Sequence, residues 1–244
     1  LSNDEIAAAL AQSLEGRAFP HGKVLIIPPD FTRYHSNAGF ITCAYWKLLA
    51  ARGVQVDVMP ALGTHVPVSA EQWKVMFPDI PYGKMIVHGW RTDVVKLGDV
   101  PAEVVAEITD GLWKEPVAVE VNRRIMDETY DLIISPGQVV PHEVIGMANH
   151  SKNLFVGVGG SDMINKSHMV GAVYGMERMM GKRPYARAED LRLRHGTFPE
   201  PAPHSLCPDR LHGSKGRERH ARPVHRRGKK LPDGSGQAGA GEEY

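Results

Sequence analysis

Three short segments of this chain combine ionisable side chains with glycine and other small residues. They span residues 28–33, 61–65 and 141–168, and each adjoins an apolar run typical of a strand. Histidine exchanges protons near neutral pH and binds metal ions, arginine holds carboxylates, and a lysine amine can form a covalent bond. Because these segments lack the periodic apolar pattern of a core element, they predict a site built on loops beside a scaffold.

Seven side chains in these segments are candidates for the site. Each also has an ordinary structural interpretation, since an aspartate can cap a turn, an arginine can form a surface ion pair, and a loop histidine can be solvated. Their order and unequal spacing favour one shared site. The candidates are Asp30, Thr32, Arg33, His65, His142, Lys152 and His168.

Apolar runs alternate with helical patterns along the chain. Strands are predicted at residues 23–28, 54–59, 85–88, 94–97, 117–121, 131–135 and 153–158, and helices at 2–14, 38–52, 69–77, 102–111 and 164–180. This alternation predicts an α/β fold with a mostly parallel, doubly wound sheet and flanking helices. Because the carboxyl ends of parallel strands share one edge, the candidate side chains are expected to converge in one crevice there.

The motifs, in this order, resemble the N-terminal domain of the nickel-pincer lactate racemase family over residues 2–182. The matching motifs are Asp-x-Thr-Arg at residues 30–33, Gly-Thr-His at 63–65, Pro-His at 141–142, then Lys152 and His168. Each motif is short, but their order and spacing make the set specific.

The resemblance implies a role for each candidate. These roles are catalysis for His65 and His142, cofactor binding for Lys152, Asp30 and Thr32, substrate binding for Arg33, and metal ligation for His168. The implied cofactor is a nickel-pincer nucleotide that is covalently attached through a thioamide at the lysine. The implied activity is that of a racemase or epimerase, which interconverts the stereoisomers of a 2-hydroxy acid by hydride transfer to this cofactor.

The expected partners are a small 2-hydroxy acid substrate and the proteins that synthesise the cofactor. Phe31 and Tyr34 stand where lactate-type members have histidine and proline, and Val66 stands where arginine is common. The substrate is therefore not fixed as lactate, and a malate-like or sugar-acid substrate fits equally well. His150 lies close to the tethering lysine in sequence and is a rival for the role given to His142.

Composition limits the remaining classes of protein. The formal net charge of +1 over 244 residues predicts no nucleic-acid surface. Two cysteines, Cys43 and Cys207, are too few for a disulfide framework, so a reducing cytoplasm is expected. No apolar stretch has the length of a transmembrane helix, and no membrane association is expected.

The composition changes abruptly after about residue 185. Residues 194–244 hold ten Lys/Arg, six Asp/Glu, eight Gly and six Pro, without Ile, Met or Trp. Such a segment cannot bury enough apolar surface to offset its ordering entropy. We therefore predict a lactate racemase-like domain at residues 1–185 and a basic, low-complexity tail without regular structure at 186–244, in the place of the family's C-terminal domain.

The tail has three interpretations: a basic arm, a histidine-based metal site, or out-of-frame translation of a GC-rich gene. Its mixture of Arg, Gly, Pro and His favours out-of-frame translation.

Two other functions of the chain also stay open. One is a non-catalytic binding module that uses the tail as its contact arm. The other is a zinc hydrolase in which His65, His142 and His168 hold the metal. Without a C-terminal domain, this chain is expected to form only part of an active site.

Overall fold

The computed structural model describes residues 1–149, 151–181 and 205–206 of the chain. The helices are α1 (Asn3–Ser13), η1 (Phe31–Ser36), α2 (Ala38–Ala50), α3 (Ala70–Met76), η2 (Tyr82–Lys84), α4 (Ala102–Ile108), η3 (Arg123–Met126), η4 (Asn153–Gly157), α5 (Ser161–Tyr174) and α6 (Met176–Met179). The strands are β1 (Lys23–Ile26), β2 (Gln55–Val58), β3 (Val94–Val100), β4 (Val117–Asn122), β5 (Leu132–Ile134), β6 (Pro141–His142), β7 (Gly146–Met147) and β8 (Ser205–Leu206). No helix in the described residues is both long and apolar enough to cross a bilayer.

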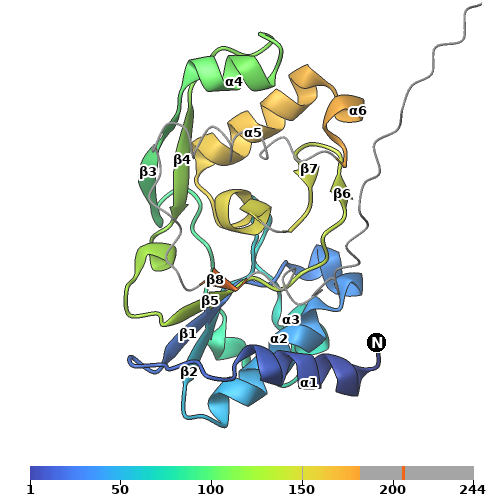
Figure 1. Ribbon diagram of the computed structural model, residues 1–244, viewed down its shortest axis with the longest axis vertical. Coiled ribbons are helices and arrows are strands. Elements are labelled where there is room, and N and C mark those ends of the chain that lie inside the picture. Colours follow the sequence, from blue (N-terminus) through green and yellow to red (C-terminus); the bar gives the residue numbers. More distant parts are fainter. Residues whose placement is uncertain (150, 182–204, 207–244) are drawn as a thin grey trace, which may run out of the picture. The chain divides into compact units, whose positions relative to one another are not determined.

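A parallel sheet positions the site. β1 pairs in parallel with β2 on one side and with β5 on the other, and β8 pairs in parallel with β5, giving the order β2-β1-β5-β8 (Figure 1). The α/β class with a parallel sheet, predicted from the alternation of strands and helices, is confirmed. Since parallel neighbours end at the same edge, the loops that follow β1, β2 and β5 are brought together.

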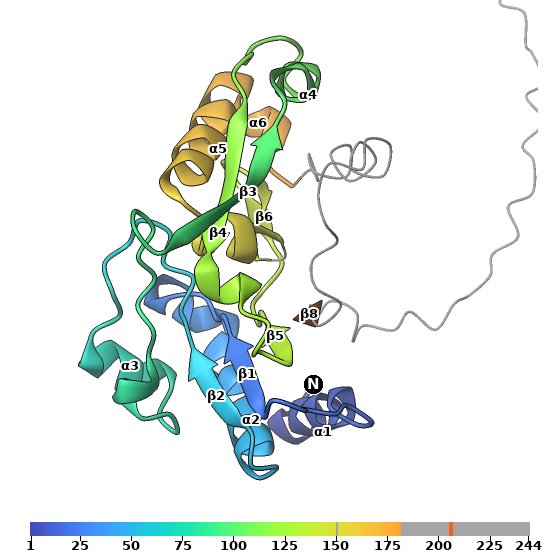
Figure 2. The ribbon, with the colours of Figure 1, turned by 90° about the vertical axis from the view of Figure 1, so that its left-hand side faces the viewer.

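Both faces of this sheet are covered, which accounts for the continuous apolar run of β1. Val24 and Ile26 join the core that the sheet forms with α1, α2 and α3, whereas Leu25 and Ile27 join a second cluster with Val158. All of these side chains are fully buried. Figure 2 shows α2 behind β1 and β2, on the side that the first core occupies. The segment that carries Lys152 therefore packs on the face opposite the helices.

The strands predicted near residues 94 and 117 lie outside the parallel sheet. They form an antiparallel pair, β3–β4, which is joined by α4 and packs against α5 (Figure 1). Val117, Val156, Met163 and Ile164 form the core between this pair, η4 and α5. This layer fixes α5, the helix on which His168 lies.

Three predicted elements differ from the structure. Residues 153–158, predicted as a strand, form the π-helical turn η4. The hydrophobic period of such a short apolar run does not distinguish a strand from a buried helical turn. Residues 85–88 contribute one bridge, from Met85 to Val58, instead of a strand. The helix predicted at 164–180 begins at Ser161 and is divided at Gly175, whose φ of 101° interrupts it.

The helices predicted at residues 2–14 and 69–77 both begin with a capping box. The side chain of Ser2 accepts from the backbone of Glu5, and the Glu5 side chain accepts from the backbone of Ser2, as a capping box requires.

Of the predicted tail at 186–244, the structure describes only β8. The rest of the tail lies outside the described residues, and the boundary near residue 185 stays a prediction.

Candidate active site

The loops that follow β1, β2 and β5 surround a pocket of about 290 Å³. This volume lies near the lower end of the range for small-molecule sites, roughly 300–1,000 Å³. The structure brings all the candidate side chains together here, as the strand order leads one to expect. The lining includes Asp30, Thr32, Arg33, His65, His142, Lys152 and His168.

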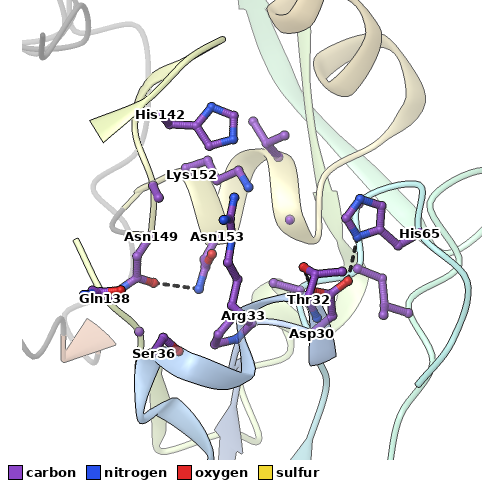
Figure 3. Close-up of a pocket in the computed structure, with 18 of the residues that line it drawn as sticks. Asp30, Thr32, Arg33, Ser36, His65, Gln138, His142, Asn149, Lys152 and Asn153 are labelled. Carbon is purple, nitrogen blue, oxygen red and sulfur yellow. Dashed lines mark hydrogen bonds and ion pairs between the residues drawn. The ribbon is translucent and has the colours of Figure 1, made fainter. Parts of the chain in front are cut away.

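Asp30 and His65 form a hydrogen-bonded pair at one side of the pocket (Figure 3). Nδ1–H of His65 donates to Oδ2 of Asp30 at 2.6 Å, while the backbone N–H and the hydroxyl of Thr32 donate to Oδ1 at 3.2 and 2.5 Å. The carboxylate is buried and the imidazole is exposed. With the proton on Nδ1, Nε2 of His65 holds a lone pair that can accept a proton. Asp30 and Thr32, expected to bind the cofactor, are thus engaged in orienting this imidazole.

His168 lies on α5, and the helix backbone fixes its ring. Nδ1–H donates to the carbonyl oxygen of Ile164, one turn earlier, at 2.7 Å. Nε2 therefore keeps its lone pair, which is the form of histidine that ligates metals. Metal-bound histidines usually donate their other N–H to a carbonyl or carboxylate oxygen, so this arrangement suits the predicted metal ligand.

His142 lies on β6 and is buried, with 7% of its surface exposed. Its Nδ1 accepts the backbone N–H of Val144 at 3.1 Å. Burial lowers the pKa of His142, and the nearby positive charge of Lys152 lowers it further. The imidazole is therefore held in its neutral form to a lower pH than an ordinary histidine.

Lys152 and Arg33 point toward one another inside the pocket (Figure 3). Burial lowers the pKa of the Lys152 amine, and the positive charge of Arg33 is the next largest cause. No hydrogen bond within the described part of the chain holds this amine. A lysine with a lowered pKa has more of its amine unprotonated at neutral pH, which is the nucleophilic form.

A glycine-rich junction, residues 157–160, connects the Lys152 segment to α5. The carbonyl oxygen of Gly157 accepts the backbone N–H of Gly63 at 2.7 Å, which ties the junction to the loop of His65. The carbonyl oxygen of Gly159 accepts Nε2–H of the buried His88 at 2.8 Å. A Cβ at Gly159 would overlap the carbonyl oxygen of Phe155, so only glycine fits this close approach.

His88 is itself held by a buried network. The Asn122 side-chain amide donates to Nδ1 of His88 at 3.0 Å and to Asp93 at 3.1 Å, and its oxygen accepts the backbone N–H of Arg124 at 3.0 Å. The backbone N–H of Asn122 donates to the carbonyl oxygen of Val158 at 2.8 Å. Burial lowers the pKa of His88, which keeps the imidazole neutral and suited to one donated and one accepted bond. This network holds the backbone of Val158 and Gly159, within the junction between the Lys152 segment and α5.

Sequence reasoning missed a buried polar cluster next to Lys152. The side-chain amide of Asn153 donates to Oδ1 of Asn149 at 2.6 Å and to Ser135 at 3.3 Å. Asn149 has a φ of 56°, in the left-handed region that asparagine tolerates. A Cβ at Gly137 would lie 2.7 Å from the Asn149 side chain, so this glycine makes room for it. The signal available in the sequence was a pair of asparagines, four residues apart, on either side of the lysine.

The structure does not support the three-histidine zinc site. Among the residues that it describes, no three His, Cys, Asp or Glu side chains lie close enough together to hold a metal ion. His65 and His142 instead lie at two sides of the pocket, with Arg33 and Lys152 between them in Figure 3. His150, the rival to His142, lies outside the described residues.

The fold defines an α/β domain with a pocket at the carboxyl edge of a parallel sheet. A family model described as the lactate racemase N-terminal domain matches residues 3–180. This chain therefore belongs to the lactate racemase N-terminal domain family.

Two solved structures are similar to this chain. A crystal structure of a structural-genomics target from Thermotoga maritima is 22% identical, with a TM-score of 0.68, over 80% of this chain and 48% of that one. The lactate racemase apoprotein from Thermoanaerobacterium thermosaccharolyticum is 14% identical, with a TM-score of 0.47, over 71% of this chain and 45% of that one. The chain thus spans about half the length of the solved structures it matches. No curated protein sequence matches it.

Proposed function

We propose that this chain provides the cofactor-bearing part of a nickel-dependent racemase or epimerase that acts on a small 2-hydroxy acid. One observation supports this most directly. Four side chains with complementary chemistry line one pocket: Lys152, His168, Arg33 and His65. Among the described residues, the amine of Lys152 has no hydrogen-bond partner, and the bond of His168 to Ile164 leaves its Nε2 available. The ring of His65 is oriented by Asp30. The match to the racemase family supports the assignment of racemase chemistry to these four side chains.

The residues present fit the nickel-pincer nucleotide of the family. The amine of Lys152 would carry the covalent thioamide, and Nε2 of His168 would ligate the metal, since its Nδ1–H is already engaged with Ile164. An imidazole nitrogen together with sulfur ligands suits nickel(II). When bound, the cofactor supplies an acceptor for the hydrogen that leaves the substrate carbon with its electron pair.

The protein's own side chains bind the substrate and move its proton. Arg33 would hold the carboxylate, for which its planar pair of N–H donors is suited. Nε2 of His65 would accept the hydroxyl proton, and the buried carboxylate of Asp30 would stabilise the imidazolium that forms. Formation of the thioamide removes the charge of Lys152, which relieves its repulsion with Arg33 and leaves the arginine free for an anion.

Partners and compartment follow from the same chemistry. Proteins that synthesise the cofactor must deliver it to Lys152, and we infer that this occurs in the cytoplasm, where free thiols such as the buried Cys43 stay reduced. The substrate is a 2-hydroxy acid whose remaining substituent is not fixed by Arg33 alone. Phe31 and Tyr34, whose rings lie 5.5 Å apart, are near Arg33 in sequence but are not among the residues that line the pocket.

The test of this proposal is covalent loading. The full chain is co-expressed with cofactor-synthesis proteins and nickel, digested, and searched by mass spectrometry for the pincer mononucleotide. We expect the adduct on Lys152, its loss in Lys152→Ala, and its retention in the control Lys166→Ala, which removes a surface lysine paired with Asp162. His168→Ala should keep the adduct but weaken nickel retention, because one of the four ligands is lost and three remain.

Substrate chemistry is tested by isotope retention. A loaded enzyme that racemises a 2-hydroxy acid in D₂O should keep the original hydrogen on the substrate carbon, since that hydrogen never mixes with solvent. Deuterium at this carbon would mean ordinary proton abstraction. An adduct at a different lysine would refute the assignment of the tether.

A further inference from the structure

The three histidines of the pocket differ in the polarity of the hydrogen bond at Nδ1. In His65 and His168, Nδ1–H donates, to Asp30 at 2.6 Å and to the carbonyl oxygen of Ile164 at 2.7 Å. In His142, Nδ1 accepts, from the backbone N–H of Val144 at 3.1 Å. A neutral imidazole carries one proton, so the proton of His142 lies on Nε2, whereas the other two rings present a lone pair there.

The position of His142 in the chain enforces this polarity. It lies on β6, and the turn toward β7 places the N–H of Val144 two residues away, against the ring. A proton on Nδ1 would face this N–H, so that two donors would meet and the part-buried backbone group would lose its partner. Glu143 is the acidic neighbour, but its oxygen lies 3.8 Å from Nδ1 and its side chain is 58% exposed, so it does not replace Val144 as the partner.

The charged groups around His142 also disfavour a second proton. Burial, Lys152, Arg33 and His168 each lower the pKa of His142, and only Glu143 raises it. His65 has the opposite surroundings, because the buried carboxylate of Asp30 faces its Nδ1–H directly. In the chain without cofactor, a protonated His65 would be paired with a carboxylate, whereas a protonated His142 would lie near the charges of Lys152 and Arg33. In the loaded enzyme the thioamide removes the charge of Lys152, and the two rings are then distinguished by their hydrogen bonds at Nδ1.

We propose that His142 acts on the substrate as a neutral hydrogen-bond donor through Nε2–H, and that His65 is the proton acceptor of the pair. This rests on the proposed function, and it deepens it by giving the two histidines different roles. The single proton in play passes from the substrate oxygen to Nε2 of His65 and back. His142 neither gains nor loses a proton; its N–H stabilises the negative charge that develops on the oxygen.

The first test needs no cofactor. The full chain with ¹⁵N-labelled histidine is studied by long-range ¹H–¹⁵N correlation, with signals assigned from His142→Gln and His65→Gln variants. Between pH 6.5 and 8, His142 should be neutral with its proton on Nε2, and His65 should carry a proton on Nδ1. A proton on Nδ1 of His142, in either the neutral or the charged ring, would overturn the proposal.

The second test separates a donor from a base in the loaded enzyme. Glutamine can place an N–H where Nε2–H of histidine lies but cannot accept a proton, and leucine can do neither. We expect His142→Gln to keep kcat/KM within about tenfold of the wild type and His142→Leu to lose about 10²–10³-fold, the usual effect of removing a donor to a developing oxyanion. Equal losses in the two variants would show that His142 transfers a proton.

A folding control keeps these outcomes distinct. Both variants are compared with the wild type by thermal unfolding, and the comparison of rates uses adduct-bearing protein only. A wild-type chain without an adduct would refute the proposed function, while the tautomer of His142 would still be decided by the spectra of the apo protein. The two failures are therefore separable.

Discussion

Asp30→Asn is the substitution for which the structure predicts the sharpest loss of activity. The Oδ1 atom of Asp30 accepts two hydrogen bonds from Thr32, at 3.2 and 2.5 Å, and Oδ2 accepts Nδ1–H of His65 at 2.6 Å. In the variant, the amide oxygen stays with Thr32, because both of those groups are donors. The NH₂ group then faces Nδ1 of His65, and two donors cannot share this contact. The ring must move its proton to Nε2, where the lone pair is needed.

The magnitude follows from what is lost. The fold loses little, because asparagine caps a helix start as well as aspartate does, so we expect a change in unfolding free energy of about 1 kcal/mol or less. The chemistry loses its proton acceptor. General-base catalysis contributes about 10²–10⁴-fold, and holding the wrong tautomer in an aspartate–histidine pair removes about 10⁴-fold. We therefore expect kcat/KM to fall by about 10³–10⁴-fold.

The chain offers a matched control in Asp131 and His21. Nδ1–H of His21 donates to the buried Asp131 at 2.8 Å, next to the amino ends of β1 and β5 and away from the pocket lining. Asp131→Asn removes a carboxylate from the same kind of pair and should leave kcat/KM unchanged. The assays are steady-state kinetics and the ¹⁵N tautomer of His65. A switched tautomer with kcat/KM within a few-fold of the wild type would refute the role of His65 as base.

Three further changes test the electrostatics and packing of the site. The lowered pKa of Lys152 means that the unfolded chain binds more protons than the folded chain between the folded-state pKa and the ordinary value of about 10.4, so the unfolding free energy rises with pH in this range. Lys152→Met should flatten this rise, and urea titrations from pH 7 to 10 will measure it. Gly159→Ala should destabilise the fold by at least ~1–3 kcal/mol because its Cβ overlaps Phe155, whereas the control Gly83→Ala, with open space around it, should not; equal urea midpoints would contradict this. His88→Leu should raise hydrogen exchange at residues 157–164 about tenfold, whereas His88→Gln should keep the protection because glutamine can still donate to Gly159. Equal exchange in the two variants would show that this network does not hold the segment.

The sequence predicted the parts of this fold that are set locally. Ser2 and Glu5 mark a helix start because a capping box is completed within four residues. The apolar runs of β1 and β5 predicted buried parallel strands, since each residue of such a run packs on one of two covered faces. The segment at 153–158 was predicted wrongly because its apolar residues fit either face of a sheet or a buried helical turn. The close approach at Gly159, which requires the helical turn, depends on Phe155 and His88 in three dimensions.

The site was predictable as a set of residues but not as a set of roles. Strand order brings Asp30 beside His65, which a motif does not reveal because the two residues lie 35 positions apart. The cofactor-binding role predicted for Asp30 stays a prediction. The asparagine cluster next to Lys152 was missed for the same reason. The bond between Asn153 and Asn149 spans only four residues, but the second partner of Asn153 is Ser135, which lies 18 residues away, after β5.

His65 and His142 show that a motif alone does not assign a chemical role to a histidine. Gly-Thr-His and Pro-His present the same side chain, and by type alone both are bases. The neighbour at Nδ1 separates them: for His65 it is a carboxylate from the adjacent strand end, and for His142 it is a peptide N–H from its own hairpin. A carboxylate stabilises the charged ring and a peptide N–H excludes it, so the same residue type becomes an acceptor in one place and a donor in the other. If the proposed function holds, the direction of proton transfer in this pocket is set by β-sheet order and by one turn, and not by the identity of the two side chains.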